Sequence, residues 1–259
     1  MSQAFGDQVL LLAERSVVRT LRQPANVVFP LVFPLMLLAV NAGGLDSATR
    51  LPGFPTDSYV AFALAIPFIQ GALFATMNAG TDLGRDIQTG FLNRLSLTPM
   101  RGVALLAGQL GGVVTMGLVQ ALVYLGVGLA VGVRLESGPL GALVLLAFAV
   151  VVAIGFGALG AFAALRTGSS EAVQGLFPVF FVFLFISSMS MPRDLIEIDW
   201  FRVAATANPV SYLIECVRSL IITGWDGEAL ALGFGIAGAI MVAALALAAV
   251  SLRTRLARS

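Results

Sequence analysis

The chain has 259 residues, of which 58% are hydrophobic and 11% are charged, with a net charge of +1. Soluble domains carry roughly a quarter of charged residues, so this composition excludes an ordinary soluble fold. All 15 basic residues are arginines, and the lack of lysine argues against a nucleotide-binding P-loop, whose lysine reaches the β- and γ-phosphates. With no histidine and a single cysteine, Cys216, neither a metal site nor an intrachain disulfide is expected.

Six stretches of 20 or more residues carry no charged side chain. Each is long enough for a helix to cross the hydrocarbon core, which takes ~20 residues. In lipid, the backbone polar groups of a crossing segment must be hydrogen-bonded within it, so these stretches are predicted to be helices. We therefore predict an all-α, polytopic membrane protein with six transmembrane helices. The predicted spans are 25–44, 58–81, 102–133, 137–165, 172–192 and 229–252.

The arginines predict the orientation of these spans. Ten of the fifteen lie on one side: before the first span, in the loops after the second and fourth, and after the sixth. The other side holds five arginines together with nine of the fourteen acidic residues. Because cytoplasmic segments are enriched in basic residues, we expect the chain in the plasma (inner) membrane with both termini in the cytoplasm. No cleavable signal peptide is expected.

Residues 5–23, which precede the first span, are predicted to form an amphipathic interfacial helix. Arg15, Arg19 and Arg22 share one helical face, and apolar residues occupy the opposite face. A helix of this kind lies on an anionic membrane surface. It is either an ordinary basic anchor or, in the sharper interpretation, also part of a docking surface for a cytoplasmic partner.

The loop between the second and third spans reads GRDIQTGFLNRLSLTPMRG over residues 84–102. Residues from about Asp86 to Leu97 can form a short helix on the cytoplasmic surface, and Pro99 is expected to end it, because proline cannot continue a helix. Such a helix can act as a rigid lever; the alternative is a solvated basic loop. Because the loop lies outside the predicted spans, Gly90→Trp and Asp86→Arg are expected to leave folding largely intact.

Three stretches resemble the ABC exporter permeases of the type-two family, particularly the daunorubicin-resistance permease group. AERSVVRTLRQPANVVFPLVFPLMLLAVNAG, residues 13–43, is similar to the family's basic entry helix, Arg-x-Pro turn and Phe-Pro in the first span. NPVSYLIECVRSLI, residues 208–221, looks like its Asn-Pro-x-Ser/Thr-Tyr segment ahead of the last span. In the loop at 84–101, the family's acidic residue, glycine, leucines and Ser/Thr-Pro are matched by Asp86, Gly90, Leu92, Leu95, Thr98 and Pro99.

The resemblance implies that residues 1–259 form a single transmembrane domain, the permease subunit of an ATP-driven exporter. It implies two ABC ATPase subunits that carry ATP and Mg²⁺, a second permease chain that is identical or a close paralogue, and surrounding membrane lipid. No catalytic residue, metal, cofactor or nucleic-acid partner is expected on this chain, which is not itself an enzyme. The residues implied to couple it to the ATPase are Arg15, Arg19, Arg22, Arg85, Asp86, Gly90, Leu92, Leu95, Thr98 and Pro99.

Residues 191–228 are too many for a turn and too polar for a span. The uncharged run 203–214 within them is short, which suits a re-entrant or interfacial hairpin that bends at Asn208-Pro209. The resemblance implies short extracellular-side helices that roof a translocation path. The alternative is simple capping of the outer leaflet.

The interior of the predicted spans carries no ionisable side chain well inside the membrane, which disfavours an ion-driven transporter. The phenylalanines of the fifth span face lipid or the core, or they line a path for an apolar or amphipathic drug, lipid or glycolipid. Alternative functions are a nucleotide-independent channel or lipid scramblase, a membrane-embedded enzyme, or a purely structural subunit. The candidate path residues are Phe177, Phe180, Phe181, Asn78, Asn208 and Tyr212.

Overall fold

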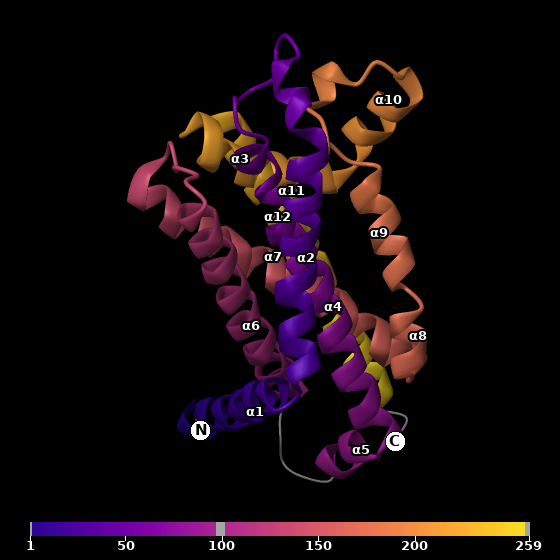
Figure 1. The fold of residues 1–259 in the computed structure, drawn as a ribbon. Coiled ribbons are helices and arrows are strands. Elements are labelled where there is room, and N and C mark those ends of the chain that lie inside the picture. Colours follow the sequence, from indigo (N-terminus) through magenta and orange to yellow (C-terminus); the bar gives the residue numbers. More distant parts are fainter. Residues whose placement is uncertain (1, 97–101, 257–259) are drawn as a thin grey trace.

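The computed structural model describes residues 2–96 and 102–256, and within them the regular elements are helices (Figure 1). This confirms the predicted all-α membrane fold. The α-helices are α1 Ser2–Leu21, α2 Pro24–Leu45, α3 Tyr59–Ala63, α4 Ala65–Gln88, α5 Phe91–Ser96, α6 Gly102–Ala130, α7 Gly138–Thr167, α8 Ser170–Gln174, α9 Phe177–Phe185, α10 Asp199–Ala207, α11 Pro209–Arg218 and α12 Gly227–Leu256. Three single turns accompany them: η1 Asp46–Arg50, η2 Arg193–Leu195 and the π-helical η3 Ser219–Thr223.

Five of the predicted spans are helices that are long and apolar enough to cross a membrane. These are Pro24–Arg50, Tyr59–Gln88, Gly102–Ala130, Gly138–Thr167 and Gly227–Leu256. The first includes η1 after α2, and the second includes α3 before α4.

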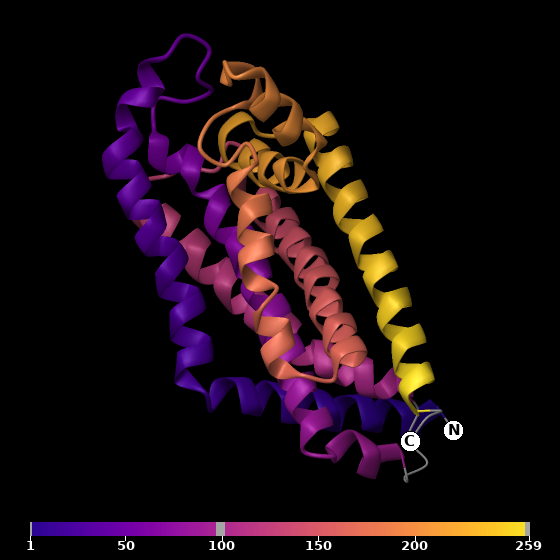
Figure 2. The ribbon, with the colours of Figure 1, turned by 90° about the vertical axis from the view of Figure 1, so that its right-hand side faces the viewer.

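The remaining predicted span, 172–192, is broken into α8 and α9. Gly175 caps α8, and Pro178 stands in the first turn of α9, where a proline needs no hydrogen-bond partner for its nitrogen. Nine residues of helix extend ~14 Å, which is well short of the ~30 Å hydrocarbon core. Together α8 and α9 follow the long axis of the bundle (Figure 2), and the count of six crossings stays a prediction.

The bundle has two distinct ends. At one end α1 lies across the other helices, close to α5 and the end of α12, and α2 rises steeply from it (Figure 2). The bend falls at Gln23, whose backbone is not helical because the following Pro24 disfavours the helical conformation. At the opposite end lie α10, α11 and the turn between α2 and α3 (Figure 1). We call these the α1 end and the α10 end.

The centre of the bundle is α4, which is buried along most of its length. It packs against α7 where two glycines meet, because a Cβ on Gly80 would lie 2.8 Å from the carbonyl oxygen of Gly160. A Cβ on Gly160 would in turn clash with the carbonyl oxygen of Thr76. Small residues of this kind allow two membrane helices to approach backbone to backbone. A displacement of α4 therefore acts directly on α7.

Candidate functional site

The candidate coupling site lies at the α1 end, and it depends on how α1 is attached. Gly108 and Gly112 on α6 leave room for α1, since a Cβ at either position would clash with Leu12 or Ser16. The Ser16 hydroxyl also donates to the backbone oxygen of Gln109 at 3.2 Å. Close backbone contact thus holds α1 in one register on α6.

Two arginines of α1 form a cluster with two aspartates of α4. Arg15 donates to both carboxylate oxygens of Asp86, at 3.1 and 3.0 Å. Arg19 bridges the two acids, with its Nη1 at 2.9 Å from Asp86 Oδ1 and its Nε at 3.2 Å from Asp82 Oδ1. The Asp86 side chain is 8% exposed, whereas those of Arg15 and Arg19 are 40% and 21% exposed. Bidentate pairs of this kind are directional, so the cluster fixes α1 to α4.

The same cluster reaches α5. The Arg15 guanidinium carbon lies 4.0 Å from the centre of the Phe91 ring, in a cation–π arrangement, and Phe91 is the first residue of α5. Arg15 therefore touches α4 and α5 together. We call Arg15, Arg19, Asp82, Asp86 and Phe91 the arginine–aspartate cluster.

The expected helix from about Asp86 to Leu97 is wrong in where it begins, and Leu97 lies outside the described residues. Instead α4 continues to Gln88, a turn follows, and α5 begins at Phe91. Gly90 has φ +69, the left-handed conformation that commonly ends a helix, and its N–H bonds to the Ile87 oxygen at 3.0 Å. Asp82 and Asp86 both lie within α4, where they pair with the arginines of α1.

The premise that Asp86 lies outside the packed helices is also wrong. Asp86 is buried and ion-paired, so reversing its charge is expected to disturb folding. Leu92 is likewise buried, in a cluster with Leu83 and Leu106. By contrast, Gly90 has open space where a Cβ would stand.

The other residues predicted to couple the chain to a partner differ in their surroundings. Arg22 and Arg85 are exposed at the α1 end. Leu95 belongs to α5, while Thr98 and Pro99 lie outside the described residues. Their proposed role stays a prediction.

A second polar link at this end was not anticipated. The Gln88 side chain donates to Glu171 Oε2 at 2.9 Å and accepts from the Ser170 hydroxyl at 3.1 Å, which joins the end of α4 to α8. Hydrogen bonds from Ser169 above all, together with those from Gln88 and Ser170, lower the pKa of Glu171 to about 2. Glu171 is therefore ionised at neutral pH.

The predicted path phenylalanines of α9 face other helices. The rings of Phe177 and Phe181 are 4.6 Å apart, and they contact Phe74 of α4 and Phe33 of α2, with ring centres 5.6 and 6.3 Å away. Phe180 contacts Phe156 of α7 at 6.4 Å, counted between ring centres. The structure thus places all three against neighbouring helices. A role in a substrate path stays a prediction.

The other predicted path residues do not gather at one place. Asn78 of α4 donates to the backbone oxygen of Asn26 at 3.4 Å. Asn208 lies between α10 and α11, at the predicted bend, and its side-chain oxygen accepts from the Val210 N–H at 2.9 Å. Asn208 therefore acts as the N-cap of α11. Tyr212 is on α11, and its hydroxyl donates to the Thr206 backbone oxygen at 2.9 Å.

Sequence reasoning missed Arg218, at the end of α11, which is the most deeply buried cation among the residues that the structure describes. It is 7% exposed, and it donates to the backbone oxygens of Phe62, Ser188 and Met189 at 3.2, 3.1 and 3.1 Å. Its guanidinium carbon also lies 3.4 Å from the centre of the Phe62 ring. Burial lowers the pKa of Arg218 to about 9, and the side chain is still cationic at neutral pH. The sequence signal that could have drawn attention to Arg218 is its position three residues after Glu215, which places both charges on one face of a helix.

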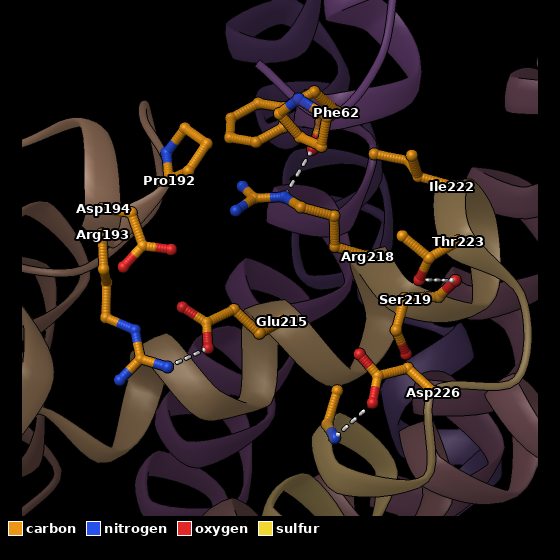
Figure 3. A pocket seen from close by; sticks show the side chains of 12 residues that line it. Phe62, Pro192, Arg193, Asp194, Glu215, Arg218, Ser219, Ile222, Thr223 and Asp226 are labelled. Atoms are coloured by element: carbon orange, nitrogen blue, oxygen red, sulfur yellow. Dashed lines mark hydrogen bonds and ion pairs between the residues drawn. The ribbon is translucent and has the colours of Figure 1, made fainter. Parts of the chain in front are cut away.

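Arg218 borders a cavity of ≈ 320 Å³ at the α10 end (Figure 3). Arg193 and Glu215 form an ion pair at one side of this cavity, with nitrogen and oxygen 2.6 Å apart (Figure 3). Asp194 also lines it, and Asp226 stands beside the start of α12, where it accepts the N–H groups of residues 228 and 229. The cavity is therefore polar and charged.

Comparison with known proteins decides the family. Residues 7–222 match the family model described as ABC-2 type transporter. The chain belongs to this family. It is 30% identical over 203 residues to the daunorubicin resistance ABC transporter permease protein DrrB1 of Streptomyces coeruleorubidus. These aligned residues cover 75% of this chain and 66% of that protein. It is 26% identical over 227 residues, or 86% of this chain and 80% of the relative, to the probable doxorubicin resistance ABC transporter permease protein DrrC of Mycobacterium tuberculosis.

Membership of the ABC-2 family confirms the resemblance to the type-two permeases and their daunorubicin-resistance group. The matched residues run from α1 to η3, so they include both the arginine–aspartate cluster and Arg218. Both features therefore lie in the part of the chain that the family model covers.

Proposed function

We propose that this chain is the permease subunit of an ATP-driven ABC exporter, which moves an apolar or amphipathic drug, lipid or glycolipid out of the cytoplasm. Membership of the ABC-2 family supports the transport role. The names of two relatives, which refer to daunorubicin and doxorubicin resistance, support an amphipathic cargo.

The observation that carries this proposal is the arginine–aspartate cluster. It joins two elements at the α1 end, α1 and α5, to the buried central helix α4. Because α4 packs on α7 at Gly80 and Gly160, a displacement of α1 or α5 by a partner is transmitted into the bundle. A ligand-driven shift between two states needs a connection of this kind between the partner's surface and the path.

The partner in this proposal is a separate ABC ATPase, present in two copies beside two permease chains. ATP and Mg²⁺ bind to the ATPase, which accords with the lack of lysine for a P-loop in this chain. The exposed arginines at the α1 end favour a cytoplasmic location for that end, in the plasma (inner) membrane. Among the described residues they are Arg15, Arg22, Arg85, Arg94, Arg166 and Arg253.

The test is transport in inside-out proteoliposomes that contain the purified chain with or without its cognate ABC ATPase. Doxorubicin and a fluorescent phospholipid serve as the two probes. We expect ATP-dependent accumulation of at least one probe when both subunits are present, and none when the ATPase or ATP is omitted. The chain alone is expected to hydrolyse no ATP.

Two results would contradict the proposal. Equal movement of a probe without ATPase and nucleotide indicates a channel or a scramblase. A chain that assembles with its ATPase but moves neither probe, and stimulates no hydrolysis, indicates a structural subunit. Substitution of the exposed Arg94 by glutamate, compared with Arg50→Glu at the α10 end, tests whether the ATPase binds at the α1 end.

A further inference from the structure

The cavity at the α10 end has the size and lining of a ligand site. Its volume of ≈ 320 Å³ lies at the lower end of the range for small-molecule pockets. Pro55, Phe62, Pro192 and Ile222 provide apolar walls, and the charged side chains converge between them (Figure 3). The cavity is therefore lined by both apolar and charged side chains, so a ligand for it should be amphipathic.

Arg218 supplies one charge to this cavity. Three of its five N–H groups are used by the carbonyl oxygens of Phe62, Ser188 and Met189. Among the residues that the structure describes, no carboxylate oxygen lies within 4.0 Å of its nitrogens. Figure 3 shows the guanidinium extending into the cavity, so its remaining N–H groups suit an oxyanion.

The neighbouring carboxylates determine which oxyanion can enter. Glu215 forms an ion pair with Arg193, and the pair carries no net charge. The charge of Asp226 is offset by the start of α12, whose N–H groups it accepts. Asp194 remains: it is exposed, and no ion pair joins it to any described cation. The site therefore presents one positive and one negative group.

A ligand with a single charge fits this pair poorly. An anion is repelled by Asp194, and a cation is repelled by Arg218, because both act across a partly dehydrated cavity. A zwitterion can satisfy both at once. An ammonium group can also donate hydrogen bonds to a carboxylate, which a quaternary choline group cannot.

The level of the cavity in the membrane points to a lipid as the source. Trp225, adjacent to Asp226, and Trp200 on α10 are both exposed at this end. Exposed tryptophans gather at the level of the lipid head groups. We propose that this cavity binds the head group of an ethanolamine phospholipid, with the phosphate on Arg218, the ammonium at Asp194 and the glycerol against the apolar wall.

This inference does not depend on the proposed transport function, because binding is measured without ATPase or nucleotide. The full chain in detergent micelles is titrated by calorimetry with dihexanoyl phosphatidylethanolamine, phosphatidylcholine and phosphatidylglycerol, and with free phosphoethanolamine. Because Asp194 is exposed, its ion pair with the ammonium group contributes about 0.2–1 kcal/mol, or roughly 1.5- to 5-fold in affinity. We expect the ethanolamine lipid to bind about two- to fivefold more tightly than the other three.

Three variants test the assignment of the charges. Asp194→Asn should reduce ethanolamine lipid binding to the level of the choline lipid, without weakening that of phosphatidylglycerol. Asp199→Asn, also exposed but on α10, is the matched control and should change nothing. Ile222→Trp fills the cavity and should abolish binding of every lipid while leaving the charges in place.

Arg218→Gln should also abolish lipid binding. Because Arg218 holds three backbone oxygens, this variant is interpreted only if its thermal unfolding remains cooperative, and the Asp194→Asn result stands without it. Equal affinity for the three lipids, or no effect of Asp194→Asn, would overturn the proposal. Free phosphoethanolamine binding as tightly as the lipid would overturn the lipid assignment and identify a soluble zwitterion as the ligand.

Discussion

The arginine–aspartate cluster gives a prediction that can be worked through in energy. Asp86→Ala removes a carboxylate that is 8% exposed and leaves Arg15 and Arg19 without three hydrogen bonds. Breaking a buried ion pair in this way costs about 3–5 kcal/mol. Arg15 is 40% exposed and can regain water, so the lower end, about 3 kcal/mol, is the better estimate. Arg15→Ala should cost less, because Arg19 still pairs with Asp86.

The assay is thermal or denaturant unfolding of the purified chain in micelles for Asp86→Ala, Arg15→Ala and the double variant. Because the two side chains belong to one network, the effects of the two substitutions on the free energy of unfolding should not add, and their coupling energy should be about 1–3 kcal/mol. The exposed pair Asp199 and Arg202 on α10 is the control, and its cycle should give at most about 0.5 kcal/mol. Additive effects at Asp86 and Arg15, or an Asp86→Ala variant as stable as the parent chain, would refute the reasoning.

Three further predictions concern single positions. Gly90→Trp should cost only about 1 kcal/mol in stability, from its positive φ, yet abolish substrate-stimulated ATP hydrolysis by the assembled complex; Gly132→Trp, with φ +94 and equally open space at the α10 end, should preserve it. Gly160→Ala should destabilise the chain by about 1–3 kcal/mol in an unfolding assay, because its Cβ meets α4, whereas Gly238→Ala, with open space, should not. Cys216 should resist maleimide at pH 8, since it is buried and its pKa is raised to about 12; rapid labelling of the folded chain would show that α11 is exposed.

The long helices could be predicted from the sequence because lipid forces charge out of a span. The predicted run 25–44 corresponds closely to α2, Pro24–Leu45, and 102–133 corresponds to α6, Gly102–Ala130. The charged end of α4 could not be predicted in this way. Asp82 and Asp86 pair with Arg15 and Arg19, which lie 60 or more residues earlier, and no local pattern shows that pairing.

The broken fifth run illustrates a second limit. Its composition alone is that of a span, and Gly175 and Pro178 were not treated as a break between two helices. Arg218 illustrates a third limit. The sequence placed it only among the five arginines of the side opposite the basic loops, whereas in the fold three carbonyl oxygens and the Phe62 ring surround it. Every residue has a backbone oxygen, so the sequence cannot show which of them accept hydrogen bonds from Arg218.

Two arginine sites, one at each end of the bundle, are connected through α4. At the α1 end, Arg15 and Arg19 hold the last turns of α4 through carboxylates. At the α10 end, Arg218 holds the oxygen of Phe62 in α3, which is separated from α4 by a single residue. The first contact depends on charge and weakens if an aspartate is removed, whereas the second depends on carbonyl dipoles and the placement of α9 and α11. A displacement of α4 that begins at α1 or α5 must therefore either be absorbed along the helix or disturb the contacts of Arg218, and with them the cavity that it borders.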